Sequence, residues 1–275
     1  MRFAPANLFA LAGLACAIGA AACSARDGGD PHSDAGVPPV GGKDMRIRDV
    51  GDPTRPEHAS YVASSPAVSG VIVTAVDTYD ETADGKGTGT IYVQDIGPGL
   101  PYSGISLFAT TFSPGNLRVS VGDVLDLKGT YQEATDRGPT AMFPRGAVQA
   151  QIAFAVASFR YETAVPQPLD ITLADLNDFE KGRQWIGQLV RVKDLTIPRD
   201  PYTASSGRVS VDIGALPLAS GCNAAFPKPA QLVNDLMDLT SYNLHAGSTI
   251  RSVVGVVGFF CSIHLAPRSA ADIQP

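Results

Sequence analysis

Hydrophobic and polar positions alternate most clearly over residues 121–131, VGDVLDLKGTY. At a period of two, one face carries Leu125, Leu127, Gly129 and Tyr131. This alternation predicts a half-buried β-strand. A glycine weakens a strand unless the strand bends or another backbone comes close. Gly129 therefore indicates a bend of the kind that a small closed barrel needs.

Further strand patterns lie on either side of this segment and are separated by turns rich in glycine and proline. A short lead-in strand is predicted over residues 45–50. Longer strands are predicted over residues 68–76, 90–95 and 104–108, and the start of another over residues 140–143. Alternation places the following residues inward: Ile91, Val93, Ile105 and Leu107.

The second half of the chain begins with a predicted linker, residues 161–168. Thr172 is placed to cap a short helix that carries Leu173, Leu176 and Phe179, with Asp175 in its first turn. Strands are predicted over residues 185–192, 208–213 and 246–258. Three leucines at spacing i, i+4, i+7 predict a short helix between the last two of these strands: Leu232, Leu236 and Leu239.

A divergent internal repeat links the two halves. Residues 246–258 parallel residues 121–129, which contain Gly122. Residues 265–268, with Pro267, parallel residues 142–145, with Pro144. The spacing from Gly247 to Pro267 is 20 residues, against 22 residues in the first half. The repeat predicts that one small barrel occurs twice.

Composition agrees with many short strands joined by turns. The chain has 275 residues with 28 glycines and 21 prolines, and only 17% of its residues are charged. Its formal net charge is −6, and removal of a leader containing Arg2 makes it more negative. Proteins that bind nucleic acids are usually basic. The acidic balance disfavours a nucleic-acid partner without excluding a local basic patch.

The N-terminal pattern predicts an export signal. Arg2 precedes an apolar run over residues 8–22, which is short for a membrane span and typical of a secretory signal. Small residues just before Cys23 resemble a bacterial lipobox, in which the cysteine is lipidated. The alternative is ordinary cleavage after residues 20–22, which gives a soluble secreted protein.

Residues 24–44 contain little that could be buried, and they predict a flexible tether. Ser24 after the lipidated cysteine resembles lipoproteins sorted to the outer membrane. These features predict a protein anchored to a membrane by lipid at the bacterial cell envelope. Without the anchor, it would be periplasmic or secreted.

The strand motifs together resemble a known module. Residues 71–76, 91–95, 104–108 and 121–133 resemble the OB-fold modules that are attached to bacterial extracellular nucleases and that also occur alone in secreted lipoproteins. The resemblance spans about residues 68–143. With the repeat, it implies an all-β chain of two small OB-like Greek-key barrels with one or two short helices. The expected segments are a signal peptide (1–23), a tether (24–44), barrel 1 (45–160) and barrel 2 (161–275).

The sequence contains no recognisable catalytic constellation, and no cofactor, metal or catalytic residue is expected. His32 and His58 are expected to be solvated, and His264 to be a hydrogen-bonded structural residue. Acidic residues crowd the loop over residues 77–85, which is interpreted either as a solvated turn or, less readily, as a calcium site, because it lacks the EF-hand alternation.

The candidate binding residues are Tyr92, Gln94 and Phe108, which alternate away from the predicted core. OB folds bind oligonucleotides and oligosaccharides on this face, and aromatic rings there can stack on bases or sugars. In the alternative interpretation, these side chains pack against the second barrel or a loop.

Cys222 and Cys261 remain after the leader and, in an exported chain, predict a disulfide. Two buried free thiols are the alternative. The function predicted overall is a non-catalytic binding or scaffold module at the envelope, with an envelope protein or glycan as partner. The alternative function is an oligonucleotide- or glycan-binding accessory to an extracellular nuclease or hydrolase.

Overall fold

The computed structural model describes residues 45–85, 87, 89–134, 149–204, 206–214, 229–260 and 262–275. All of these belong to one unit, residues 35–275. The predicted signal peptide, the tether, the lipidation site Cys23 and the disulfide between Cys222 and Cys261 lie outside the described residues. They stay predictions.

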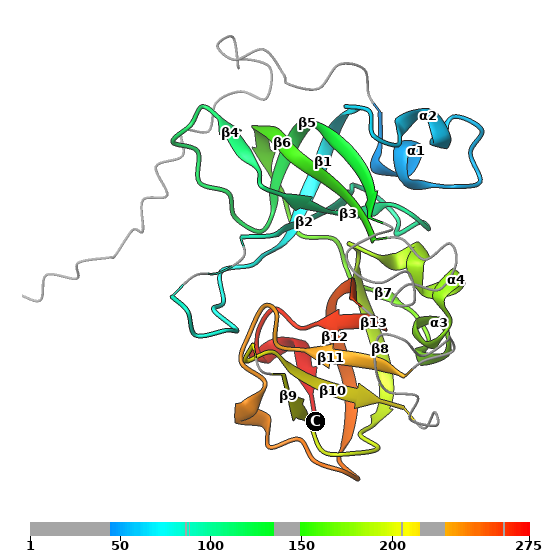
Figure 1. The fold of residues 1–275 in the computed structure, drawn as a ribbon, viewed down its shortest axis with the longest axis vertical. Helices are drawn as coiled ribbons and strands as arrows, with labels where there is room; N and C mark the ends of the chain where they lie inside the picture. The colour runs from blue at the N-terminus through cyan, green and yellow to red at the C-terminus, as the bar shows by residue number, and fades with distance from the viewer. Residues whose placement is uncertain are drawn as a thin grey trace, which may run out of the picture. The chain divides into compact units, whose positions relative to one another are not determined.

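The first half forms a closed five-stranded barrel (Figure 1). Neighbouring strands are antiparallel, except that β3 runs parallel to β6 and closes the barrel. Around the barrel the strands follow the order β1-β2-β3-β6-β5-β1. If the five barrel strands are numbered one to five along the chain, this is 1-2-3-5-4-1, the OB arrangement. The strands are β1 (Ala67–Val76), β2 (Ile91–Asp95), β3 (Gly104–Phe108), β5 (Asp123–Ala134) and β6 (Gln149–Glu162), and the short β4 (Thr111–Ser113) pairs with β6.

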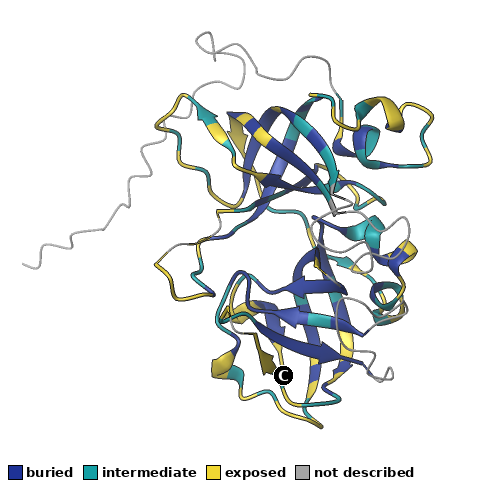
Figure 2. Ribbon diagram, viewed as in Figure 1, coloured by how far each residue is buried: buried dark blue, intermediate teal, exposed yellow. Residues whose placement is uncertain are grey.

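The core of this barrel contains the residues that alternation predicted. Leu125, Leu127 and Tyr131 of β5 have no exposed surface, and their neighbours on β2 and β3 are buried with them (Figure 2). Burial of apolar surface stabilises such a core by about 25 cal/mol per Å². The buried partners from β2 and β3 are Ile91, Val93, Ile105 and Leu107.

Gly129 permits the bend that was predicted. A Cβ at this position would lie 2.6 Å from Ile152 Cγ2, so β6 can approach only a glycine here. The pairing of β5 with β6 shifts at this point, between Lys128 and Thr130. Opposite the shift, Phe154 has a φ of +52° and its side chain is 64% exposed. The bulge therefore turns a large aromatic side chain out to solvent.

The fifth strand of the barrel is β6, which the sequence patterns did not predict. The predicted segment 140–143 lies outside the described residues. In β6, Ala153, Ala155 and Ala157 are buried, whereas Phe154 and Val156 are exposed. Because the larger residues face outward, the hydrophobic pattern gives no signal for the inward face. The strand also runs through Glu162, into the segment predicted as a linker.

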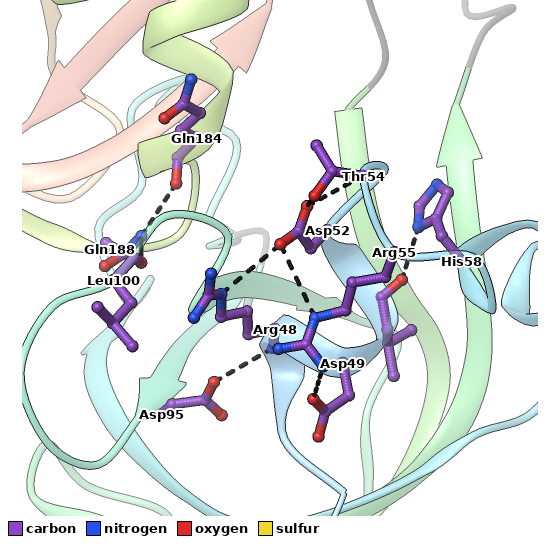
Figure 3. Close-up of polar contacts among 11 residues, drawn as sticks. Arg48, Asp49, Asp52, Thr54, Arg55, His58, Asp95, Leu100, Gln184 and Gln188 are labelled. Carbon is purple, nitrogen blue, oxygen red and sulfur yellow. Dashed lines mark hydrogen bonds and ion pairs between the residues drawn. The ribbon is translucent and has the colours of Figure 1, made fainter.

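The prediction of a lead-in strand over residues 45–50 was wrong, because this segment forms the helix α1 (Ile47–Gly51), followed by α2 (His58–Tyr61). The Asp95 carboxylate accepts hydrogen bonds from the backbone N–H groups of Ile47 and Arg48, at 2.8 and 3.2 Å, which satisfies free donors at the start of α1. Figure 3 shows the contact between Asp95 and Arg48. Long-range capping of this kind is invisible in the local pattern.

The second half contains a sheet with the same strand order. Its strands are β8 (Leu189–Thr196), β10 (Val209–Ile213), β11 (Ala230–Val233), β12 (Thr249–Phe260) and β13 (Ser262–Ala266), and β11 runs parallel to β13. Between β8 and β10, Gly214 N–H donates to Thr196 O at 2.8 Å. Short strands extend the sheet: β7 (Leu169–Asp170), β9 (Tyr202–Thr203) and β14 (Ile273–Gln274). That the two sheets descend from one repeat stays a prediction.

The predicted cap at Thr172 is confirmed. Thr172 Oγ1 accepts from Asp175 N at 3.2 Å at the start of α3 (Leu173–Asn177), and the helix α4 (Phe179–Gly182) follows. Leu176 and Phe179 are buried in the core of the second sheet, together with the predicted inward face of β10. That face consists of Val209, Val211 and Ile213.

One element prediction in this half was wrong, and one predicted strand begins later than expected. Leu232 belongs to strand β11, where it pairs with Val211 and Leu265, and the chain then turns, so no helix spans residues 232–239. Leu232 is buried in the strand, and Leu236 and Leu239 are buried in the segment that follows it. Their helical spacing therefore did not reflect a helix. Trp185 lies in a 3₁₀ helix, η1 (Arg183–Trp185), and the strand starts only at Leu189. Further 3₁₀ turns are η2 (Thr240–Tyr242) and η3 (Ala270–Asp272).

Candidate functional site

The predicted binding face of the first barrel packs against the second sheet. Gln94 of β2 is buried, and its Oε1 accepts a hydrogen bond from Leu189 N at 3.0 Å. Tyr92 packs against a mixed hydrophobic cluster that contains Ala75 of the first barrel and Leu189 and Val233 of the second. From the other side, Arg268 Nη1 donates to Thr74 O at 3.2 Å.

Two backbones meet at this junction. A Cβ at Gly187 would lie 2.2 Å from Ile105 N, and a Cβ at Gly104 would lie 2.5 Å from Gln188 N. Only glycine allows an approach this close. Gln188 Nε2 adds hydrogen bonds to Leu100 O at 2.9 Å and to Gln184 O at 3.0 Å (Figure 3). The inner end of the face predicted to bind ligand is therefore occupied by protein.

Beside this junction, a cavity of about 450 Å³ lies between the two barrels. A volume in this range accommodates a small organic molecule. Its walls come from both halves of the chain. Described lining residues from the first barrel include Asp77, Glu81, Tyr92, Ser106, Phe108 and Gln151, and those from the second include Ser206, Arg208, Asp235, Phe260 and His264.

Ionisable groups from both barrels meet in the wall of the cavity. Arg208 Nε lies 3.2 Å from Asp235 Oδ1, and Arg208 Nη2 lies 3.8 Å from Glu81 Oε1. His264 Nε2 lies 3.5 Å from Asp235 Oδ2. Asp77, at the end of β1, is also buried here. Asp235 thus has both of its oxygens near a nitrogen, whereas Glu81 has one distant cation.

The environment shifts the pKa of several of these groups. Burial, reinforced by the charges of Glu81 and Asp235, raises the pKa of Asp77 to about 7. Burial lowers the pKa of His264, although Asp235 opposes the shift, so His264 favours its neutral form. Burial and the nearby carboxylates raise the pKa of Tyr92, so its hydroxyl stays protonated. The cavity wall is rich in negative charge.

Aromatic rings line the mouth of the cavity. Phe108 is 39% exposed and Phe260 is 48% exposed. The Phe108 ring contacts the ring of Phe154 edge-on, with centroids 6.4 Å apart, so the bulge in β6 supports this wall. The Arg208 guanidinium lies 5.6 Å from the centroid of the Phe260 ring. Exposed rings held in this way offer flat apolar faces to a ligand.

The structure brings two of the three predicted binding residues to this cavity. Tyr92 and Phe108 line it, whereas Gln94 is buried at the junction. That any of them binds a ligand stays a prediction. The sequence pattern alone does not assign Arg208, Asp235 or Phe260 to this cavity, because only tertiary packing brings them to the first barrel. The crowded carboxylates at Asp77 and Glu81 were the one available signal.

The histidines lie in different settings. His264 is buried beside Asp235, and the structural role predicted for it stays a prediction. The prediction that His58 is solvated was wrong, because His58 is buried in α2. Its Nδ1 lies 2.8 Å from Val50 O, and its Nε2 lies 2.6 Å from Glu133 Oε1. Figure 3 shows the His58 ring with one of its contacts. These contacts hold α2 against the first barrel.

In the described ranges of the chain, no group of three or more His, Cys, Asp or Glu side chains is arranged to hold a metal ion. No helix in the same ranges is both long enough and apolar enough to cross a membrane.

No family model and no curated protein matches the chain. Among solved structures, the single-stranded DNA binding protein from Thermus aquaticus is similar, with 13% identity, coverage of 74% of this chain and 91% of that chain, and a TM-score of 0.21. A deletion mutant of the same protein gives 12% identity, coverage of 74% and 93%, and a TM-score of 0.20. The assignment of the OB arrangement rests on the strand order and pairing given above.

Proposed function

We propose that this protein is a non-catalytic binding protein of the bacterial cell envelope, and that its ligand occupies the cavity between the two barrels. The observation that carries the proposal is the cavity itself, which joins exposed aromatic rings to a wall of buried polar groups. Ligand sites typically combine apolar walls with a few placed polar groups, and they often lie between domains.

The envelope location is part of the proposal and rests on the sequence. Lipidation at Cys23 would anchor the chain, and residues 24–44 would let the barrels stand off the membrane. An anchored protein with a binding cavity can hold a small solute or a glycan end close to the cell surface. In this proposal its partners are the membrane lipid and the ligand, with an envelope protein as a further partner.

A glycan-binding accessory to an extracellular hydrolase is the second candidate, and the aromatic mouth of the cavity favours it. The faces of Phe108 and Phe260 suit the apolar faces of sugar rings, and the carboxylates nearby accept hydrogen bonds from hydroxyl groups. An oligonucleotide ligand has less support. The face along β2 is packed at Gln94, and the acidic wall repels phosphate.

A binding screen tests the proposal. The purified protein is titrated calorimetrically with small envelope solutes, short glycans and single-stranded DNA at two salt concentrations. We expect a small solute or glycan to bind, and Phe108→Ala to weaken that binding at least tenfold. Tyr161→Ala is the matched control, because Tyr161 is similarly exposed on β6 at 43% but does not line the cavity. Equal losses in both variants, or binding to DNA alone, would contradict the proposal.

A further inference from the structure

The wall of the cavity contains a buried carboxylate that lacks a hydrogen-bond donor for one of its oxygens among the described residues. The Glu81 side chain is only 4% exposed. Among the described residues, its Oε2 has no hydrogen-bond partner. Among the same residues, the only cation paired with its other oxygen is the Arg208 guanidinium, at 3.8 Å. A buried acceptor without a partner costs about 1–3 kcal/mol, and a charged acceptor costs more.

The described groups around Glu81 do not compensate its negative charge. Arg208 is engaged by Asp235 at 3.2 Å and lies over the Phe260 ring. His264 favours its neutral form and faces Asp235. Asp77 adds a further acidic group to the same wall. Among the described lining residues, carboxyl groups therefore outnumber the cations, and a positively charged ligand would be drawn to Glu81.

The remaining walls suit an organic cation. Cations bind the faces of aromatic rings within about 6 Å of the centroid, and the protein already uses this contact between Arg208 and Phe260. Phe108 and Tyr92 supply further rings from the first barrel. Among the described residues, no ligand set for a metal ion is present. The combination of carboxylate and aromatic groups favours an ammonium group attached to a carbon skeleton.

We propose that the cavity binds a small organic amine in its ammonium form, with Glu81 accepting the N–H hydrogen bond and the rings of Phe108 and Phe260 packing against the carbon skeleton. This inference rests on the proposed function and narrows its ligand class. The ammonium would supply the donor that Glu81 Oε2 lacks. It would also offset the negative charge shared by Glu81, Asp77 and Asp235.

Calorimetric titration with 1,4-diaminobutane, and with 1,4-butanediol as its neutral counterpart, tests the inference at pH 8. We expect the diamine to bind at least tenfold more tightly than the diol. Glu81→Gln keeps the size of the side chain and removes its charge, and it should weaken diamine binding at least tenfold. Glu57→Gln is the matched control, because Glu57 is exposed and does not line the cavity. Circular dichroism shows whether each variant is folded.

Glucosamine and N-acetylglucosamine, compared with the diamine at pH 6.5, where the glucosamine nitrogen is protonated, identify the source of the ammonium group. If the ligand is an amino sugar, glucosamine should bind more tightly than the diamine, and acetylation of its nitrogen should abolish the gain. If the ligand is a free amine, the diamine should bind more tightly than glucosamine. Both outcomes support an ammonium ligand.

Other outcomes separate this inference from the proposed function. If neutral glycans bind and Phe108→Ala weakens their binding while Glu81→Gln does not, the ammonium inference is overturned and the proposed function stands. Diamine binding that Glu81→Gln leaves unchanged also overturns the inference. If no probe binds in a way that depends on Phe108, both proposals are overturned.

Discussion

Phe154 is held in a backbone conformation that bulky side chains rarely adopt, with a φ of +52° and an exposed ring. Strain of this kind persists only where the surrounding structure imposes it, and it often occurs at functional sites. Here the bulge opposite Gly129 imposes the strain. It places the Phe154 ring against the ring of Phe108 at the mouth of the cavity.

Replacement of Phe154 by glycine tests this account. Glycine adopts positive φ without strain, so Phe154→Gly should change the free energy of unfolding by less than about 0.5 kcal/mol while weakening ligand binding. Val156→Gly is the control, because Val156 is also exposed on β6 at 38% but is not among the residues with positive φ. Val156→Gly should cost about 1 kcal/mol in a urea titration. Equal costs for the two changes would show that Phe154 is not strained.

Asp77 should give the protein a distinct pH dependence. Burial beside Glu81, Asp235 and Arg208 raises its pKa from 3.8 to about 7, so the folded state binds more protons than the unfolded state between these values. Stability contributed by protonated Asp77 is therefore lost as pH rises from about 4 to 7. Asp77→Asn keeps the neutral form at every pH. It should raise the free energy of unfolding at pH 8 by about 1 kcal/mol or more, because one pKa unit corresponds to about 1.36 kcal/mol.

Denaturation at pH 5 and at pH 8 measures this effect, because the advantage of the Asp77→Asn variant should appear mainly at the higher pH. The comparison with the unsubstituted protein cancels the contributions of other groups. These include His264, whose lowered pKa acts in the opposite direction below pH 6.5. They also include Asp95, whose pKa burial raises to about 6. An advantage of equal size at both pH values would contradict the assignment.

Single elements were predictable where one face alone meets the core. Strands β2 and β3 place in the core the four residues that the sequence predicted there: Ile91, Val93, Ile105 and Leu107. The Thr172 cap follows from residue type and spacing. Alternation failed in β6, where the bulge at Phe154 interrupts the period and alanines fill the inward positions. It also failed at Gln94, because an outward residue is indistinguishable in sequence from one that a second barrel covers.

The contact between β3 and the turn before β8 is sensitive to a single methyl group. Alanine at Gly187 would place a Cβ 2.2 Å from Ile105 N, at a φ of +81° that alanine disfavours. We expect Gly187→Ala to lower the free energy of unfolding by at least about 1–3 kcal/mol, the usual cost of overpacking. Gly115→Ala is the control, because nothing lies within 4 Å of its added Cβ. A Gly187 variant as stable as the Gly115 variant in urea would contradict the close approach.

At the scale of the whole molecule, the fold class could be predicted from the sequence, whereas only Tyr92 and Phe108 of the cavity lining were predicted as binding residues. The strand motifs predicted the all-β class, and the resemblance to OB-fold modules implied the strand order that the first barrel has. The cavity depends on how two barrels pack together, and strand periodicity carries no information about that packing. The carboxylates of the loop at Asp77 gained a candidate role only when Arg208 and Asp235 were placed opposite them.

The same packing makes a prediction about nucleic acid. Because the second barrel covers the inner part of the β2–β3 face and the chain has a formal charge of −6, single-stranded DNA should show no binding by fluorescence anisotropy at 50 mM salt. Salt-sensitive binding that is lost on combined Tyr92→Ala and Phe108→Ala would contradict this account. It would favour an oligonucleotide ligand.

The central claim is that the cavity between the barrels is the binding site, and chemical-shift mapping tests it most directly. The ¹⁵N-labelled protein is titrated with the tightest ligand from the screen, and the amide signals that move are identified. The account predicts that they come from both barrels around the cavity, including Glu81, Ser106 and Arg208. Shifts confined to one barrel and distant from these residues would contradict it.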